Sequence, residues 1–321
     1  MILITGGAGF IGSNLINHLT NIRKERIISI DWHNENNRRY FHSNRFEVIK
    51  PEKLKEFLRK NHKIIRTIIH LGAITSTTER NLDLIIDNNI KLSFSLWEWC
   101  VKNKKRFIYA SSAATYGNGD FGFSDNNHDN YLSQLIPLNL YGWSKHIFDR
   151  FLWKKRKEGV HPTQCVGLKF FNVYGPNELH KKNMKSIVLK IYERIQKNQA
   201  IKLFKSHNLN YKDGEQLRDF VYVKDVVEII GWFLENQKVN GLFNVGSSKP
   251  KSFNNLTNVV YRNCNKERKI QYVNTPKDIR DQYQYYTKAD ITKLRKVGYK
   301  KGFFSLKDGI NDYIRNYLNR L

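Results

Sequence analysis

The first twelve residues constrain the fold of this chain more than any other stretch. Residues 2–4 form a short apolar run, which is typical of a buried parallel strand. Gly6, Gly9 and Gly12 follow at a spacing of three. In such a pattern the first glycine permits a tight turn, the second lets a pyrophosphate approach the backbone, and the third lets a helix pack closely against the sheet. The unpaired N–H groups at the start of that helix would face the phosphates. The segment therefore predicts a dinucleotide-binding strand–turn–helix unit.

The second predicted strand supports the same interpretation. Residues 26–30 are mostly apolar, and the acid Asp31 follows them about twenty residues after the glycines. An acid at this position accepts hydrogen bonds from a ribose hydroxyl, which favours the free 2′-hydroxyl of NAD. Arg38 and Arg39 lie in the polar stretch that follows, and they could instead hold the 2′-phosphate of NADP. The residues by themselves leave the choice between the two cofactors open.

Composition narrows the classes of protein that the chain can belong to. No stretch approaches the ~20 apolar residues that span a bilayer, and the strand expected from Ile2 leaves no room for a signal peptide. The three cysteines lie far apart and lack metal-ligand spacing. We therefore expect a cytoplasmic protein with reduced thiols, no metal and no membrane contact.

The net charge of +26 is the unusual global property of the chain. Such a charge suggests an anionic partner. The excess lysines are scattered along the sequence, and short clusters such as residues 154–157 lie beside helical patterns, so we interpret them as solvated faces. We expect no nucleic-acid partner, although the charge should help a nucleotide-linked anion to find its site.

Strand and helix patterns alternate along most of the chain. Helices are expected at residues 13–21, 51–60, 87–103 and 141–156. Buried strands are expected at residues 66–73 and, each together with its exit turn, at residues 106–117 and 165–176. Residues 118–136 and 205–217 are polar and are expected to be loops. The alternation predicts an α/β fold, namely a Rossmann-type doubly wound parallel sheet with a smaller mixed α/β substrate domain.

Two predicted elements carry residues suited to proton transfer. Ser111 and Ser112 end one strand, at the edge of the sheet where ligands bind. Tyr141 and Lys145 are four residues apart and so lie on one face of a helix. Because a nearby ammonium favours the phenolate, we expect Lys145 to lower the pKa of Tyr141 from about 10. Tyr141 would then act as a proton acceptor near neutral pH.

Together these segments resemble the extended short-chain dehydrogenase/reductase superfamily, and the resemblance covers essentially the whole chain. Within it, residues 72–79, 109–117, 170–176 and 283–290, together with His180 and Lys181, resemble the ADP-L-glycero-D-manno-heptose 6-epimerase family. That family prepares the heptose donor of the lipopolysaccharide inner core. The resemblance implies a dinucleotide domain of residues 1–170, 219–247 and about 284–308, and a substrate domain of residues 171–218, 248–283 and 309–321.

The resemblance also implies the contents of the site. Tightly bound NADP, with NAD as the other possibility, would contact Gly6, Gly9, Phe10, Ile11, Gly12, Asp31, Trp32, Arg38, Leu71, Gly72, Ala73, Ile74, Thr75, Asn88, Lys145, Val173 and Lys181. The nucleotide sugar would contact Asn172, Asn183, Lys190, Phe204, Lys205, Ser206, His207, Arg218 and Tyr283. The chain departs from the family at Asn183 and Lys190, where the family carries Ser and His, and in a longer loop before Arg218.

The implied reaction inverts C6″ of ADP-D-glycero-β-D-manno-heptose by transient oxidation on a retained nicotinamide. Tyr141 and Lys181 would be acid/base groups on opposite sides of the sugar, Ser112 would bind the reacting oxygen, and Lys145 would orient the cofactor ribose. We expect a homo-oligomer. The alternatives are another nucleotide-sugar epimerase, such as a UDP-hexose 4-epimerase, and a non-catalytic dinucleotide-sensing or nucleic-acid-binding Rossmann protein. A dehydratase is disfavoured because the residues after Ser112 lack an acidic pair.

Overall fold

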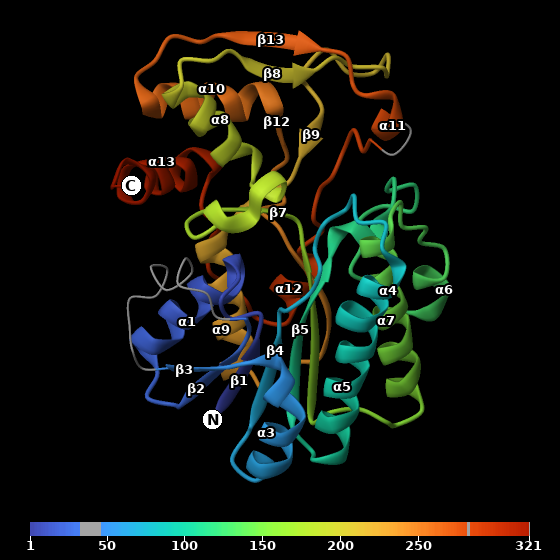
Figure 1. The fold of residues 1–321 in the computed structure, drawn as a ribbon. Helices are drawn as coiled ribbons and strands as arrows, with labels where there is room; N and C mark the ends of the chain where they lie inside the picture. Colours follow the sequence, from blue (N-terminus) through green and yellow to red (C-terminus); the bar gives the residue numbers. More distant parts are fainter. Residues whose placement is uncertain (33–45, 281–282, 321) are drawn as a thin grey trace.

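Seven parallel strands form the central sheet of the computed structural model, which describes residues 1–32, 46–280 and 283–320 (Figure 1). Their spatial order is β3-β2-β1-β4-β5-β6-β11, and every neighbouring pair is parallel. The order reverses between β1 and β4, which is where doubly wound sheets bind ligands. The strands are β1 (Ile2–Thr5), β2 (Ile27–Ile30), β3 (Phe46–Ile49), β4 (Thr67–His70), β5 (Arg106–Ser112), β6 (Gln164–Phe170) and β11 (Gly241–Val245).

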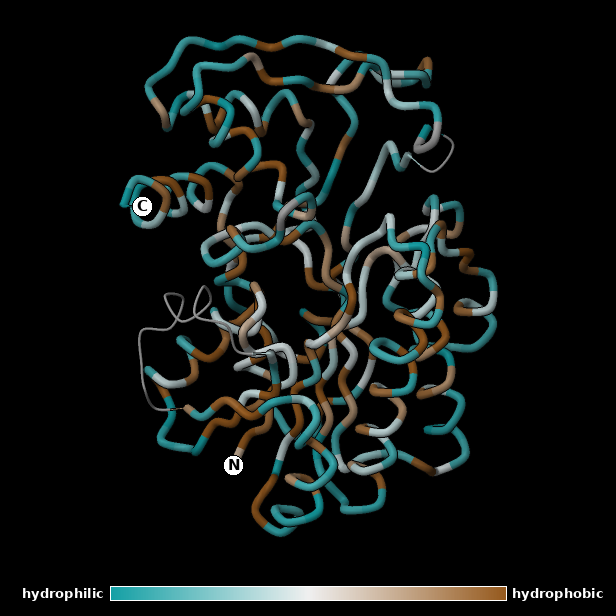
Figure 2. The backbone as a smooth tube through the Cα atoms, viewed as in Figure 1, coloured by the Kyte–Doolittle hydropathy of each residue, from teal (hydrophilic) through white to brown (hydrophobic). Residues whose placement is uncertain are grey.

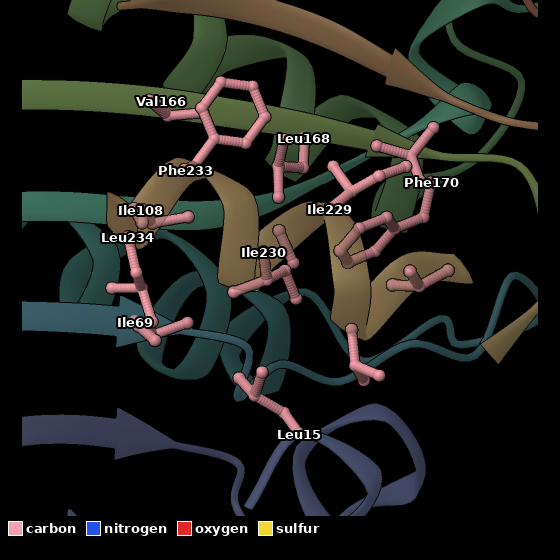
Figure 3. Close-up of a cluster of buried hydrophobic side chains, with 14 of the residues drawn as sticks. Leu15, Ile69, Ile108, Val166, Leu168, Phe170, Ile229, Ile230, Phe233 and Leu234 are labelled. Carbon is pink, nitrogen blue, oxygen red and sulfur yellow. The ribbon is translucent and has the colours of Figure 1, made fainter. Parts of the chain in front are cut away.

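Helices cover both faces of this sheet. On one face α1 (Phe10–Ile22) and α9 (Val223–Glu235) bury side chains such as Leu15 and Ile230 against Ile69 and Ile108 of the strands (Figure 3). On the other face α3 (Leu54–Asn61), α5 (Leu92–Lys102) and α7 (Leu140–Lys157) contribute a second core. Apolar residues are concentrated along the central strands, and many polar residues lie on the outer helices (Figure 2). The predicted Rossmann-type fold is confirmed.

A smaller mixed lobe lies beyond the carboxyl ends of the strands (Figure 1). Its own apolar core joins three helices to the parallel pair β8 and β13. Two further pairs, β7 with β10 and β9 with β12, connect the lobes, and the second pair is antiparallel. The elements are β7 (Asn172–Tyr174), α8 (Ile187–Gln196), β8 (Ile201–Phe204), β9 (Leu217–Arg218), β10 (Phe220–Tyr222), β12 (Lys251–Ser252), α10 (Phe253–Cys264), β13 (Ile270–Val273) and α13 (Leu306–Asn316). The domain boundaries stay a prediction.

One buried carboxylate ties distant parts of the chain together where the lobes meet. Asp219 follows β9 and is 0% exposed. It accepts hydrogen bonds from the backbone N–H groups of Ser247, Ser248 and Ala289 at 2.6, 2.9 and 2.8 Å. These bonds hold the exit of β11 and the C-terminal third of the chain against the junction.

The structure corrects the expected elements in three places. The helix expected at 87–103 begins earlier, as α4 (Leu82–Ile85), and runs through a π-helical turn (Ile86–Lys91) into α5, because Asn81 caps it and accepts the Leu84 N–H at 3.0 Å. Strand β3 was not expected, because as the edge strand it has no fully buried residue. The expected loop 118–136 contains α6 (Asp129–Leu132).

Short elements complete the described chain. They are η1 (Pro51–Lys53), η3 (Ala113–Tyr116), η4 (Leu179–Met184), α11 (Lys277–Arg280), α12 (Thr292–Lys296) and η5 (Leu318–Arg320). Among the described residues, every helix is too short or too polar to cross a membrane.

Candidate active site

The glycine loop between β1 and α1 has the geometry that its sequence predicts. Gly6 has a φ of +73°, and a Cβ there would lie 2.6 Å from the nitrogen of Gly72, in the loop that follows β4. A Cβ on Gly12 would lie 2.0 Å from the Gly6 carbonyl oxygen. Helix α1 begins at Phe10 with no side-chain cap, so the N–H groups of its first turn are suited to bind a phosphate. The backbone therefore forms a cradle that side chains would fill.

Asp31 is held at the end of β2, next to this loop. One carboxylate oxygen accepts the Ala8 N–H and the other accepts the Trp32 N–H, both at 2.8 Å. The acid is thus fixed at the place where a ribose would follow the phosphates. Arg38 and Arg39, on which the choice between NAD and NADP depends, lie outside the described residues.

A cavity of about 500 Å³ runs along the carboxyl ends of the strands from this loop. This volume is within the usual range for ligand sites. Apart from Arg38, every residue predicted to bind the cofactor lines it: Gly6, Gly9, Phe10, Ile11, Gly12, Asp31, Trp32, Leu71, Gly72, Ala73, Ile74, Thr75, Asn88, Lys145, Val173 and Lys181. Ser112 and Tyr141 line it too. The cradle, the acid and the cavity together fit a nicotinamide dinucleotide.

Sequence reasoning missed part of this lining. Thr5, Ile30, Pro51, Leu54, Leu92, Ala110, Phe170, Phe171 and His180 also face the cavity. Most of them are apolar residues at strand ends or on helices behind the site, so no motif marks them. Ile30, Ala110 and Phe170 lie near the ends of predicted parallel strands, and this position could have marked them as part of the site.

Helix α7 positions the Tyr141 and Lys145 pair. Asn139 caps the helix by accepting the Gly142 N–H at 2.8 Å, which sets the first turn and therefore Tyr141. Burial raises the pKa of Tyr141, and a hydrogen bond with Ser112 partly opposes the rise. The predicted net lowering of this pKa by Lys145 is therefore wrong, because desolvation of the phenol is the larger effect.

Lys145 is itself almost fully buried, with 3% of its surface exposed. Burial lowers its pKa to about 8, while the carboxylate of Asp149 acts in the opposite direction. The ammonium therefore persists at neutral pH, but with a small margin. In this state Tyr141 can donate a proton; to accept one it must first ionise, and a charged Lys145 favours that ionisation.

Lys181 reaches the same cavity from η4, whose Leu179 packs against the apolar core of the small lobe. It lies on η4, and its ammonium nitrogen is 5.0 Å from the centre of the Phe10 ring, at the start of α1. Burial lowers its pKa, and the nearby carboxylate of Glu178 opposes the change. Glu178 is 0% exposed and accepts the N–H and the hydroxyl of Ser186 at 2.5 and 2.6 Å, which fixes the η4 turn. Tyr141 and Lys181 thus face one cavity from two different lobes.

The residues predicted to bind the nucleotide sugar lie outside this cavity. Three of them meet in the small lobe: the Arg218 guanidinium lies 5.3 Å from the Tyr283 ring, and the Phe204 and Tyr283 rings are 5.7 Å apart. Arg218 is 8% exposed, and it donates to the Leu217 carbonyl at 3.0 Å. The cluster offers a cation and aromatic faces, which suit a nucleoside diphosphate.

The remaining residues of that set are spread around this cluster. Ser206 donates to the Asn208 carbonyl at 2.8 Å, and the His207 N–H donates to the Tyr285 hydroxyl at 2.8 Å. Asn172 donates to the Asp219 carbonyl at 3.2 Å. Lys205, Asn183 and Lys190 are exposed. The residues predicted to bind the sugar therefore do not share one cavity lining, whereas the described residues predicted to bind the cofactor do.

Sequence reasoning also missed buried polar residues behind the cavity. His70 is 1% exposed, and its two ring nitrogens lie 2.6 Å from the Thr5 hydroxyl and 2.8 Å from that of Ser93. Burial lowers the pKa of His70 to about 3, so the ring is neutral. Asp149 and Lys169 form a buried ion pair. The available signal for Asp149 was its place four residues after Lys145.

Comparison with known proteins defines first the class and then the family. Residues 2–246 match the model of the NAD dependent epimerase/dehydratase family. The chain is 42% identical to ADP-L-glycero-D-manno-heptose-6-epimerase of Fusobacterium nucleatum subsp. nucleatum, over 99% of this chain and 98% of that protein. It is 41% identical to the protein of the same name in Nitratidesulfovibrio vulgaris strain Hildenborough, with the same coverage.

Solved structures agree. The ADP-L-glycero-D-manno-heptose-6-epimerase of Helicobacter pylori is 30% identical, with a TM-score of 0.79 over 98% of this chain and 95% of that one. A UDP-glucuronic acid 4-epimerase of Bacillus cereus, in complex with NAD, is 24% identical with a TM-score of 0.82 over 99% of both chains, which shows the shared fold. The chain therefore belongs to the NAD dependent epimerase/dehydratase family and, within it, to the ADP-L-glycero-D-manno-heptose-6-epimerases.

Proposed function

We propose that the protein converts ADP-D-glycero-β-D-manno-heptose into its L-glycero epimer by inverting C6″, and so supplies the heptose donor for the lipopolysaccharide inner core. One observation supports this most directly: Tyr141 and Lys181 line one cavity from different lobes, beside Ser112 and Lys145. Inversion at a carbinol carbon needs proton transfer on two faces of the sugar, and two acid/base groups that approach from different lobes meet that need.

A nicotinamide held by the glycine loop, Asp31 and Lys145 would accept the hydride from C6″ and later return it. Tyr141, once ionised beside the Lys145 ammonium, would take the C6″ hydroxyl proton of one epimer, and Ser112 would hydrogen-bond the same oxygen. The resulting aldehyde turns over in the site and presents its other face. Lys181 would protonate the carbonyl oxygen from the opposite side as the hydride returns. The proton held by Tyr141 would then pass through solvent back to Lys181, so that both groups regain their starting states. Because the two steps are redox-neutral in sum, the cycle would need no exchange of the cofactor.

We propose NADP as the cofactor, with NAD as the alternative. The support is the basic pair Arg38 and Arg39 after Asp31, which suits a 2′-phosphate, together with the family resemblance. Denaturing the purified protein and identifying the released dinucleotide by chromatography tests this. Release of NAD in place of NADP would overturn the choice.

We further propose that the protein is a cytoplasmic homo-oligomer that acts on a small nucleotide sugar and binds neither nucleic acid nor membrane. The scattered distribution of the positive charge in the sequence supports the absence of a nucleic-acid partner. Light scattering on the purified protein gives the oligomeric state, and a DNA and RNA retention assay at low salt tests the second part.

The experiment for the main proposal adds no cofactor. The purified protein is incubated with ADP-D-glycero-β-D-manno-heptose, and the C6″ epimers are resolved by chromatography or NMR. We expect the L-glycero epimer to appear, which reports substrate, reaction and retained cofactor together. No conversion, even with NADP and NAD supplied, would overturn the proposal. Conversion of UDP-hexoses alone would assign the protein to another epimerase class.

A further inference from the structure

A buried ion pair behind the catalytic helix has no role in the mechanism given above. Asp149 of α7 and Lys169 of β6 are both 0% exposed, and the Lys169 ammonium lies 2.8 Å from an Asp149 carboxylate oxygen. Removing two charges from water costs several kcal/mol per ion, so such a pair is weak evidence for stability. Its position suggests a different purpose.

The pair is fixed by hydrogen bonds to the strand that carries Ser112. The Asp149 carboxylate accepts the Tyr109 hydroxyl at 2.8 Å and the Ser111 hydroxyl at 2.7 Å, both from β5. Lys169 donates to the Thr115 hydroxyl at 2.6 Å, and its ammonium lies 4.8 Å from the centre of the Tyr116 ring. The carboxylate therefore has three close partners, Lys169, Tyr109 and Ser111, and one defined position.

Helix geometry directs this carboxylate toward the active site. Tyr141, Lys145 and Asp149 are spaced by four residues each, so they follow one another along one face of α7. The carboxylate is the anion that acts on Lys145, whereas His70, which faces Lys145 from β4, is neutral. Asp149 also interacts with Cys165 of β6 and His146 of α7, and burial holds both neutral near pH 7. The remaining titratable groups that it affects are the phenols Tyr109, Tyr116 and Tyr141, whose pKa values burial raises.

We infer that Asp149 is a positioning residue that keeps Lys145 as an ammonium, and that Lys169 holds Asp149 in place for this purpose. The inference rests on the proposed function, in which a charged Lys145 orients the cofactor ribose and supports Tyr141. Burial lowers the pKa of Lys145, and the carboxylate one helical turn further along α7 opposes that change. Lys169 meanwhile balances Asp149, so that the phenol of Tyr141 does not face an uncompensated anion.

The test measures the protonation of Lys145 directly and needs no substrate. Lysine side-chain carbons are labelled with ¹³C in the full-length protein as purified, and the Lys145 signal is assigned by its loss in Lys145→Met. The wild-type midpoint is compared with that of Asp149→Asn, which keeps the shape of the side chain and removes its charge. We expect the midpoint to fall, by on the order of one pH unit, because an opposite charge that favours the ammonium is lost.

Two further variants separate a positioning role from a structural one. Asp149→Asn leaves Lys169 unpaired and destabilises the fold, so Asp149→Asn combined with Lys169→Met removes both buried charges. We expect a lowered Lys145 midpoint in this double variant as well. Asp312→Asn breaks a remote ion pair with Lys224 and is the matched control, which should leave the midpoint unchanged.

An unchanged Lys145 midpoint in both Asp149 variants would overturn the inference, whatever their stability. The alkaline limb of the pH–rate profile should move to lower pH together with the midpoint. If the midpoint moves and the wild-type protein fails to epimerise the ADP-heptose, the proposed function is wrong and the inference about Asp149 stands. The two failures are therefore distinguishable.

Discussion

At the scale of single residues, the proposed chemistry depends on one phenol and one amine. Tyr141→Phe removes one oxygen atom, and Lys181→Met removes one charge while keeping the length of the side chain. Each change should lower kcat by roughly 10²–10⁴-fold, the usual contribution of a general acid or base, and leave the bound dinucleotide in place. Turnover of the ADP-heptose and the dinucleotide content of the same samples are the two measurements.

Matched controls exist for both changes. Tyr131→Phe removes a hydroxyl that contacts Ser124 and Gly122 in a loop, and Lys185→Met breaks an ion pair with Glu193. Neither control should alter kcat by more than about twofold. Full activity in either site variant would remove that residue from the chemistry.

A buried acid away from the site makes a prediction about stability. Asp225 is 4% exposed, and burial raises its pKa to about 7, although its carboxylate accepts the Phe304 N–H at 3.1 Å. The folded protein therefore keeps this proton up to about pH 7, whereas the unfolded chain loses it near pH 4. Because the unfolded state binds fewer protons in this window, stability falls as the pH rises through it.

Asp225→Asn should remove that dependence. Between pH 4 and pH 8 the free energy of unfolding of the wild type should fall relative to the variant, by at most about 4 kcal/mol. Urea unfolding at several pH values measures the difference, in which the contributions of all other groups cancel. Parallel pH profiles for the two proteins would show that Asp225 titrates normally in the fold.

At the scale of elements, the contact between the glycine loop and α1 carries a prediction. A Cβ on Gly12 would lie 2.0 Å from the Gly6 oxygen and 2.7 Å from the Gly7 Cα, so the helix has to move. Gly12→Ala should cost about 1–3 kcal/mol or more and release the dinucleotide. Gly302→Ala is the control, because a Cβ there meets nothing within 4 Å. Thermal unfolding and dinucleotide content are measured for both, and a Gly12→Ala protein that keeps its dinucleotide would contradict the prediction.

How far elements can be predicted depends on how deeply they are buried. Strands β1, β4 and β6 consist of fully buried residues, so their apolar runs are plain in the sequence. Strand β3 is an edge strand with an exposed residue, and its pattern does not separate it from a loop. The start of α4 depends on the single capping contact of Asn81, and the neighbouring residues carry no pattern that predicts a helix start there.

The same reasoning applies to the candidate site. Its cofactor half follows from the sequence because glycines and strand ends determine where the backbone goes. The residues predicted to bind the nucleotide sugar lie on β8, on β9 and in the segment around Tyr283, which are far apart in the sequence. No local pattern relates such segments, so only the family resemblance brought them together, and it did not reveal the ion pair of Asp149 and Lys169 behind the site.

At the scale of the whole molecule, the charge of +26 should act on the encounter with substrate. An ADP-sugar is an anion, and a positive protein draws it in over distances that salt screens, about 10 Å at 0.1 M. We expect kcat/KM to fall several-fold between 20 mM and 500 mM NaCl while kcat at saturating substrate stays nearly constant. A sucrose series at matched viscosity is the control. If kcat/KM did not change with the salt concentration, the net charge would make no contribution to substrate capture.

The bonds of Asp219 bear on how the protein is made in the cell. A ribosome that has reached the end of β6 has already produced the whole glycine loop, Tyr141 and Lys145. The carboxylate, however, finds its last donor only when Ala289 emerges, about seventy residues after Asp219 itself. Contacts between such distant positions slow folding, because the entropy cost of closing a long loop comes before the stabilising contact forms. The nascent chain therefore stays incomplete at its lobe junction until nearly all of it has been synthesised, and a product truncated before residue 289 should occupy chaperones instead of binding nucleotide.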